Sequence, residues 1–259
     1  MSRIPMGGYN NMPNPALYET FPQAYIGMGD TAENLALKYS IDRKEQEAFA
    51  LESQKKAFTA QQQGHFDDEI IPITSKYGTV DKDGCLRPDS TAEGLAGLNP
   101  AFQATGTVTA GTSSPLTDGA AAMLVCSEEY ADAHKLPKLA RIKSFAVSGC
   151  APEIMGIGPV AATNKALTRT GLTLADIDIV ELNEAFSAQS LAVLKELPIP
   201  TDKLNLDGGA IALGHPLGAT GVRITGKAAS LLQRENKRYA LATQCIGGGQ
   251  GIATILEAI

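Results

Sequence analysis

The sequence has no tryptophan, little histidine and cysteine, no long apolar run and no excess of positive charge. Its 259 residues include 3 histidines and 4 cysteines, and the formal net charge is −6. No apolar run approaches the roughly 20 residues that cross a bilayer, and the opening stretch MSRIPMGGYNNMPNP has no apolar signal region. Surfaces that bind duplex nucleic acid carry clustered lysine and arginine. We therefore expect no membrane span, no secretion signal and no nucleic-acid partner.

The cysteines are scattered along the chain. They lie at Cys85, Cys126, Cys150 and Cys245 and form no C-x-x-C pair. This spacing is typical neither of a zinc site nor of a disulfide scaffold. We therefore expect reduced thiols in a cytoplasmic compartment, and no metal. The sequence does not distinguish a bacterial cytoplasm from an organelle.

The second half of the chain alternates between strand and helix patterns. Strands are expected at KLARIKSFAVSG, IDIVEL, YALATQ and GIATILE, and helices at VAATNKALTRTG (ended by Gly171), FSAQSLAVLKEL and GVRITGKAASLLQRE. Such alternation is typical of a layered α/β fold. We place the start of this α/β domain near residue 137.

The first half is less regular. Two helices are expected over residues 30–40 and 41–64, and Asp42 and Glu45 resemble a capping box at the start of the second. One apolar face of that helix is expected to hold Ala50, Leu51, Ala57 and Phe58. A short strand is expected in DEIIPI (68–73), and a buried apolar strand in AAAMLVC (120–126), followed by a helix.

Polar residues follow three expected strands or turns in the second half. Asn183 follows IVEL, His215 lies in the glycine-rich stretch GGAIALGHPLGATG, and Cys245 precedes IGGGQG. Ligands of α/β sheets gather outside the carboxyl ends of the strands, so these three side chains are candidates for one pocket. Taken singly, each has a structural interpretation: a helix cap for Asn183, a satisfied buried imidazole for His215, an inert core thiol for Cys245 and a hairpin turn for the glycines.

Taken together, these motifs resemble the thiolase family. The resemblance is carried by NEAF (183–186), GGAIALGHPLGATG (208–221) and CIGGGQG (245–251), supported by GMGDTAEN and GTVTAGTSSPLTDGAAA, and it covers the whole chain. It is closest to the 3-ketoacyl-CoA thiolases of fatty-acid breakdown, although acetoacetyl-CoA thiolases share most of these motifs. The resemblance implies an acyltransferase with two similar α/β halves, a loop domain inserted in the first half, and coenzyme A as a substrate rather than a cofactor.

The resemblance also implies roles for individual residues. His215 would activate a nucleophilic cysteine and form one oxyanion hole with a water held by Asn183. Cys245 would be the general acid/base for the α-proton of the acetyl unit, and the backbone N–H of Gly247 would belong to a second oxyanion hole. These groups suit thiolytic cleavage of a 3-ketoacyl-CoA, or the reverse condensation, because negative charge develops on thioester oxygens.

Three further residues are matched to the substrate by the resemblance. Ser114 would lie near the pantetheine arm of coenzyme A, whereas Met155 and Phe186 would shape the acyl pocket. Their structural interpretations are a turn cap and two core side chains.

The sequence departs from the family in one respect. None of the other three cysteines fits the position of the family's nucleophile, so we expect a thiolase chain that lacks its N-terminal part and is inactive alone. The implied domains are a loop domain (1–103), a remnant of the N-terminal half (104–136) and a C-terminal thiolase domain (137–259). Full-length thiolases form homo-oligomers, an assembly that this departure leaves open.

The same motifs have three interpretations other than an active thiolase. The main alternative is a non-catalytic thiolase remnant that binds coenzyme A thioesters or a partner chain. A ketoacyl synthase of the same fold is disfavoured, because such enzymes pair two histidines with their cysteine. A dinucleotide-binding interpretation is weak, since no G-x-G-x-x-G follows an expected strand.

Overall fold

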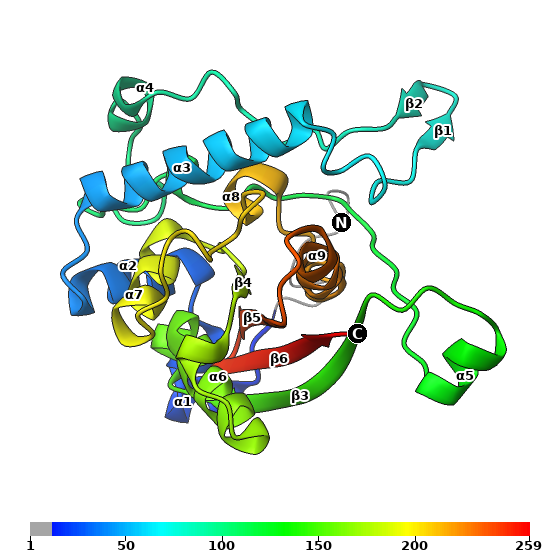
Figure 1. Cartoon of the computed structure of the whole chain (residues 1–259). Coiled ribbons are helices and arrows are strands. Elements are labelled where there is room, and N and C mark those ends of the chain that lie inside the picture. The colour runs from blue at the N-terminus through cyan, green and yellow to red at the C-terminus, as the bar shows by residue number, and fades with distance from the viewer. Residues whose placement is uncertain (1–11) are drawn as a thin grey trace.

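A four-stranded mixed sheet forms the centre of the C-terminal half (Figure 1). The computed structural model describes residues 12–259. The strands are β3 (Ala140–Gly149), β4 (Ile179–Leu182), β5 (Tyr239–Ile246) and β6 (Gln250–Ala258), in the order β3-β6-β5-β4. β4 and β5 are parallel, and β6 is antiparallel to both of its neighbours. The expected α/β fold class is confirmed.

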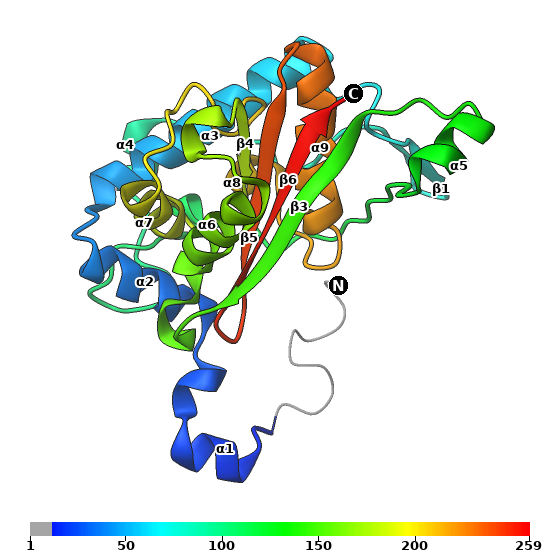
Figure 2. The ribbon, with the colours of Figure 1, turned by 60° about the horizontal axis from the view of Figure 1, so that its bottom comes forward.

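Helices cover both faces of this sheet (Figures 1 and 2). One face packs against α6 (Gly158–Thr170) and α7 (Ser187–Glu196), through strand residues such as Leu241 and Ile255. The other face packs against α9 (Thr220–Arg234), through Ile179 and Ala242 among others. Successive strand residues point to opposite faces, so the apolar runs of β4 and β5 supply both cores.

The shorter elements connect these layers. They are α1 (Pro15–Thr20), α4 (Ala92–Ala96), α5 (Glu128–Ala133), α8 (Ala210–Leu213), and the 3₁₀ turns η1 (Pro22–Tyr25), η2 (Ala110–Thr112), η3 (Pro152–Ile157) and η4 (Leu174–Asp176). The expected end of α6 at Gly171 is confirmed, because Gly171 is its C-cap with φ 71°. Glycine is favoured there since a left-handed cap is strained for residues with a Cβ atom.

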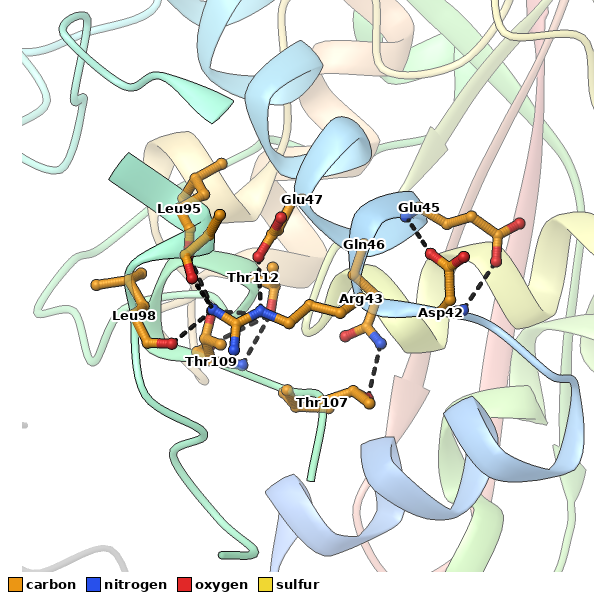
Figure 3. Close-up of polar contacts among 12 residues, drawn as sticks. Asp42, Arg43, Glu45, Gln46, Glu47, Leu95, Leu98, Thr107, Thr109 and Thr112 are labelled. Carbon is orange, nitrogen blue, oxygen red and sulfur yellow. Dashed lines mark hydrogen bonds and ion pairs between the residues drawn. The ribbon is translucent and has the colours of Figure 1, made fainter. Parts of the chain in front are cut away.

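Two helices from the first half of the chain pack beside this C-terminal unit. They are α2 (Met28–Lys38) and α3 (Arg43–Gln62). The capping box of α3 is confirmed: the Glu45 N–H donates to Asp42 Oδ1 at 2.8 Å, and the Asp42 N–H donates to Glu45 Oε2 at 2.9 Å (Figure 3). The Arg43 guanidinium donates to the carbonyl oxygens of Leu95 and Leu98, which fixes α4 against the start of α3.

The expected apolar face of α3 was wrong in part. Ala50 and Ala57 are buried, but Phe58 is 39% exposed. The buried face consists of small and polar residues, Gln46, Glu47, Ala50, Ser53, Gln54, Ala57 and Ala60. This face covers loops, α7 and α8 rather than the sheet, so its polar side chains bond to backbone and side-chain groups there, as Gln46 does to Thr107 at 2.9 Å.

The strand expected in DEIIPI was also largely wrong. Only its last residue, Ile73, belongs to a strand, β1 (Ile73–Ser75), which pairs with β2 (Gly78–Val80). Every residue of this hairpin is exposed, because no layer of the described structure covers it. The apolar pattern of the segment therefore does not mark a core strand.

The buried strand expected in AAAMLVC is not formed in this structure. Residues 120–126 have no regular structure, and Met123, Leu124 and Val125 are 40%, 69% and 62% exposed. The segment runs past α9 to α5, which stands away from the sheet (Figures 1 and 2). A strand needs a hydrogen-bonded neighbour, and no strand in residues 12–259 pairs with this segment. The helix expected after it is confirmed as α5.

Candidate active site

His215 lies in the turn between α8 and α9. α8 ends at Gly214, whose φ of 94° directs the chain away from the helix; a Cβ atom there would also collide with Thr117. His215 Nδ1 then lies 2.6 Å from Thr220 Oγ1, in the first turn of α9. The glycine-rich stretch thus sets a histidine against the start of a helix.

The contacts of His215 define its tautomer. The Thr220 hydroxyl also lies 3.0 Å from the Pro216 carbonyl oxygen, which only accepts hydrogen bonds. Both bonds form only when Thr220 donates to Pro216 and accepts from His215 Nδ1–H. Nε2 is then unprotonated and is the nitrogen on which His215 can act as a base.

Asn183 lies beside that nitrogen. Its backbone N–H donates to the Thr243 carbonyl at 3.0 Å, which continues the pairing of β4 with β5. Its Nδ2 lies 3.4 Å from His215 Nε2, at the long end of the hydrogen-bond range. Its Oδ1 is buried and has no hydrogen-bond partner within the described residues.

A buried polar network holds the NEAF segment in place. The Asn205 side chain bonds both backbone groups of Leu182 at 2.9 Å and donates to Glu184 Oε1 at 2.8 Å. Glu184 Oε2 accepts from the Ser53 hydroxyl at 2.6 Å and from the Ile211 N–H at 3.2 Å. Ser53 belongs to α3, so the first half of the chain helps to fix the segment that carries Asn183.

The environment of His215 disfavours its charged form. Burial lowers its pKa below the usual value of 6.5, and the positive charge of Arg223 lowers it further. The imidazole is therefore mainly neutral at pH 7. A neutral imidazole with an unprotonated Nε2 has the protonation state that a general base requires.

Cys245 lies in an apolar cluster at the end of β5. This cluster also holds Met155 and Phe186. The Phe186 ring packs edge-on against the Phe102 ring, with 5.8 Å between the ring centroids. Burial raises the pKa of Cys245 to about 12, with a smaller contribution from Cys150. The thiol is therefore protonated at pH 7 and is suited to give a proton rather than to attack as a thiolate.

The predicted catalytic residues form two groups. Asn183 and His215 are in contact, and alternation along β4 places Asn183 on the α9 face with Glu181. Cys245 lies on the opposite face with Leu241. Leu182 and Thr243 are register partners, so both groups lie at the same edge of the sheet. No hydrogen bond in the described structure joins Cys245 to His215, and their shared catalytic role stays a prediction.

The remaining predicted residues adjoin these groups. The Ser114 N–H donates to the Ala185 carbonyl at 3.0 Å, so Ser114 lies against the NEAF segment. Gly247 is exposed in the β5–β6 turn, where the next two glycines have positive φ angles. The glycines of CIGGGQG thus do form a hairpin turn, and the coenzyme A and oxyanion roles of Ser114 and Gly247 stay predictions.

The other cysteines have separate surroundings. Cys85 Sγ lies 3.7 Å from Thr117 Oγ1, Cys150 Sγ lies 3.7 Å from the Met155 carbonyl oxygen, and Cys126 is exposed. None of them is hydrogen-bonded to His215 in the described residues. Within residues 12–259, no group of histidine, cysteine and acidic side chains could hold a metal, and no helix is long and apolar enough to span a membrane.

Sequence reasoning missed the residues that support His215. Thr220 follows His215 by five positions, which places it in the first turn of α9. That spacing could have indicated Thr220 as a partner of His215. Arg223 lies one further turn along α9, and nothing in its local sequence indicates an effect on His215.

A mixed sheet between helical layers, with a histidine at the carboxyl edge of its strands, defines an α/β protein with a candidate acid–base site. The family model for the thiolase C-terminal domain matches residues 136–258, and that for the thiolase N-terminal domain matches residues 9–129. The chain belongs to the thiolase family. The loop-domain, remnant and C-terminal divisions at residues 103 and 136 stay predictions, and residues 1–11 lie outside the described structure.

Named relatives agree with this assignment. A 3-ketoacyl-CoA thiolase of Bacillus subtilis (strain 168) is 46% identical over 270 residues, covering 99% of this chain and 69% of the relative. An acetyl-CoA acetyltransferase of Chromobacterium violaceum is 51% identical over 253 residues, covering 96% of this chain and 64% of the relative. The chain thus spans about two thirds of the length of these curated relatives.

Solved structures show the same fold. The crystal structure of the Bacillus anthracis acetyl-CoA acetyltransferase has a TM-score of 0.88 and 43% identity, over 98% of this chain and 67% of that one. Human mitochondrial 3-ketoacyl-CoA thiolase in complex with CoA has a TM-score of 0.87 and 42% identity, over 99% of this chain and 67% of that one.

Proposed function

We propose that this chain supplies the histidine–asparagine–cysteine part of a thiolase site that acts on 3-ketoacyl-CoA. The reaction is thiolytic cleavage to acetyl-CoA and a shortened acyl-CoA, or the reverse condensation. The observation that carries the proposal is the pair formed by Asn183 and His215, in which Thr220 sets the imidazole tautomer and Nε2 is the basic nitrogen. The names of the relatives, 3-ketoacyl-CoA thiolase and acetyl-CoA acetyltransferase, support the substrate class.

The residues divide the proton transfers between them. In the cleavage direction, a thiolate attacks the 3-keto carbon, the bond between C2 and C3 breaks, and its electron pair forms the enolate of acetyl-CoA. Cys245 gives its proton to C2 of that enolate, which its protonated state at pH 7 permits. His215 takes the proton of an attacking thiol at Nε2 and keeps it there, so that Nε2–H donates a hydrogen bond to a thioester oxygen, with Asn183 beside it. The Cys245 thiolate left by protonation of C2 then takes the proton of the coenzyme A thiol, and the coenzyme A thiolate takes the acyl group from the nucleophile, which leaves as a thiolate. Each such donor to a developing oxyanion contributes roughly 10²–10³ in rate.

The attacking thiolate is the part that this chain does not supply. Cys245 holds the proton-transfer position, and Cys85, Cys126 and Cys150 have no hydrogen bond to His215 in the described structure. Covalent catalysis depends on its nucleophile, and removal of the nucleophile in a serine hydrolase costs on the order of 10⁶ in rate. We therefore expect no measurable thiolysis by the 259-residue chain alone.

The test is cleavage of acetoacetyl-CoA with coenzyme A. It compares this chain with a fusion in which the part of the Bacillus subtilis relative that has no counterpart here is added at the N-terminus. Turnover is expected only in the fusion, and it should be lost in the His215→Ala and Cys245→Ala versions of the fusion. Cys126→Ala is the matched control, because Cys126 is exposed and lies in neither group. If the 259-residue chain alone cleaves acetoacetyl-CoA and Cys245→Ala abolishes that cleavage, the nucleophile lies within this chain and its assignment here is wrong.

The alternative is a non-catalytic protein that binds coenzyme A thioesters or a partner chain. The apolar cluster of Cys245, Met155 and Phe186 would adjoin the acyl group in this function too, and that role needs no nucleophile. Calorimetric titration of the chain with acetyl-CoA separates the two functions when it is combined with the activity assay of the fusion. Binding together with an inactive fusion would support the alternative.

A further inference from the structure

β3 is an outer strand of the sheet, and within the described residues its strand neighbour is β6 alone (Figure 2). Just beyond its end, the Cys150 N–H donates to the Gly249 carbonyl at 2.8 Å, so the backbone groups of Cys150 face β6. In an antiparallel pair, the backbone groups of successive residues face alternately toward the partner and away from it. The register is unbroken over residues 144–149, so the backbone groups of Phe145 and Val147 face outward, away from β6. An outward edge of this kind is a template for pairing with another chain.

Two cationic side chains of α6 bond to the outward carbonyl groups. Lys165 Nζ donates to the Val147 carbonyl oxygen at 3.0 Å, and the Arg169 guanidinium donates to the Phe145 carbonyl oxygen. Lys165 and Arg169 are four positions apart, so they lie on the same side of α6. Four helical residues rise about 6 Å and two strand residues rise about 7 Å. The spacing of the two donors therefore matches that of the two acceptors.

Without these donors, the edge would suit a second copy of β3. Phe145 and Val147 are 60% and 41% exposed. Two identical strands that pair antiparallel about a two-fold axis are self-complementary, so each copy would offer the same outward N–H and carbonyl groups. Aromatic and β-branched side chains also form favourable cross-strand pairs. The partner that fits the uncovered edge is therefore this same chain.

A bulge limits the part of β3 that could pair. The register with β6 shifts between Ile142 and Ser144, which makes Lys143 an extra residue on this strand. Lys143 Nζ lies 2.9 Å from Glu257 Oε2 of β6. Bulges and lysines are common on edges that stay unpaired. The regular part of the outward edge is therefore residues 144–149, which contains both carbonyl groups bonded by α6.

We propose that Lys165 and Arg169 close the β3 edge to a second copy of this chain by occupying the outward carbonyl oxygens of Val147 and Phe145. Loss of the two donors would free two acceptors in the order that an antiparallel β3 strand requires. Residues 144–149 would then become an interface between two copies. This inference does not depend on the proposed function, since none of these residues belongs to the candidate active site.

The experiment measures the mass of the protein by analytical ultracentrifugation over a range of concentrations. The test variant combines Lys165→Met and Arg169→Met, because methionine retains an unbranched apolar side chain but cannot donate a hydrogen bond. The matched control combines Lys237→Met and Arg238→Met, which removes the same two charges from exposed positions before β5. General effects of net charge are thus equal in the two variants.

All proteins in this comparison carry Leu124→Lys and Val125→Lys, because residues 124 and 125 are exposed and apolar and offer another route of association. The expected result is a doubling of mass in the test variant, whereas the control retains the mass of the protein without methionine substitutions. Hydrogen–deuterium exchange locates the contact: the amides of Phe145 and Val147 should exchange more slowly in the associated variant.

Three outcomes would overturn the proposal. They are an unchanged mass in a natively folded test variant, an equal increase in the control, and association without slower exchange at Phe145 and Val147. Single substitutions decide the question if the test variant does not fold. Arg169→Met frees the Phe145 carbonyl alone and should associate at higher concentrations, whereas Arg169→Lys retains a donor and should not. Equal masses of these two single variants at all concentrations would also overturn the proposal.

Discussion

At the scale of single residues, the site depends on charges and protons that burial displaces from their usual states. His215 is held neutral, and Cys245 is held protonated with a pKa of about 12. Glu181, 1% exposed, is held as a neutral acid by the same effect. The three groups have in common that removal from water penalises the charged form. Burial thus sets the protonation state of the site before any substrate is bound.

Replacement of Glu181 tests this effect through stability. The folded-state pKa of about 8 lies above the usual 4.5, so the folded protein holds this proton more tightly than the unfolded chain. The stabilising contribution is complete below about pH 4.5 and is lost as the pH rises through 8. The side chain of the Glu181→Gln variant cannot ionise. Over this range, the free energy of unfolding of the variant should therefore rise relative to that of the unmodified protein by about 1.4 kcal/mol per pH unit.

Urea unfolding at pH 5, 6, 7 and 8 measures that difference. Glu93→Gln is the control, because Glu93 is an exposed carboxylate of α4, far from Glu181 in sequence. Parallel curves for Glu181→Gln and the unmodified protein across the four pH values would show that Glu181 is ionised in the folded state.

At the scale of secondary-structure elements, the sequence predicted the helix caps, which depend on neighbouring residues. The Asp42–Glu45 capping box and the Gly171 cap were both readable, because each depends on backbone groups a few residues away. The buried face of α3 was not readable, since its polar residues bond to distant partners, as Ser53 does to Glu184. Asn183 and His215 could be predicted because each lies in a local sequence motif. Arg223 could not, because its relation to His215 arises only in the folded chain.

Two glycine substitutions test the distinction between cap and helix interior. Gly171→Ala should destabilise the protein by roughly 1 kcal/mol, because its φ of 71° is strained for alanine although no atom lies within 4 Å of the added Cβ. Gly226→Ala should stabilise it by about 0.5–1 kcal/mol, because Gly226 lies within α9 with open space around the added Cβ.

Thermal and urea unfolding measure both changes. Gly84→Ala is the control, since Gly84 has open space, no positive φ and no helix around it. Equal effects of Gly171→Ala and Gly84→Ala would mean that the left-handed cap contributes nothing to stability.

At the scale of the whole molecule, two parts of the chain differ in how completely they are packed. The sheet has apolar clusters on both faces, whereas residues 116–125 run outside these clusters. In that segment Leu116 is 90% exposed and Leu124 69%. The apolar pattern of residues 120–126 predicted a buried strand, and the prediction failed because burial requires a partner strand that the described residues do not provide. Exposed apolar segments of this kind favour association.

Paired substitutions in this segment test that view of the molecule. Leu124→Lys with Val125→Lys should change the free energy of unfolding by less than about 0.5 kcal/mol, because both side chains are already exposed. The same variant should bind less of an apolar dye and should scatter less light as its concentration rises, since two charges replace apolar surface. Leu241→Ala is the contrasting variant: Leu241 is fully buried in β5, and its truncation should cost about 2–5 kcal/mol. A loss of that size in the double lysine variant, measured by urea unfolding, would mean that residues 124 and 125 are buried in solution by another part of the chain or by a second copy.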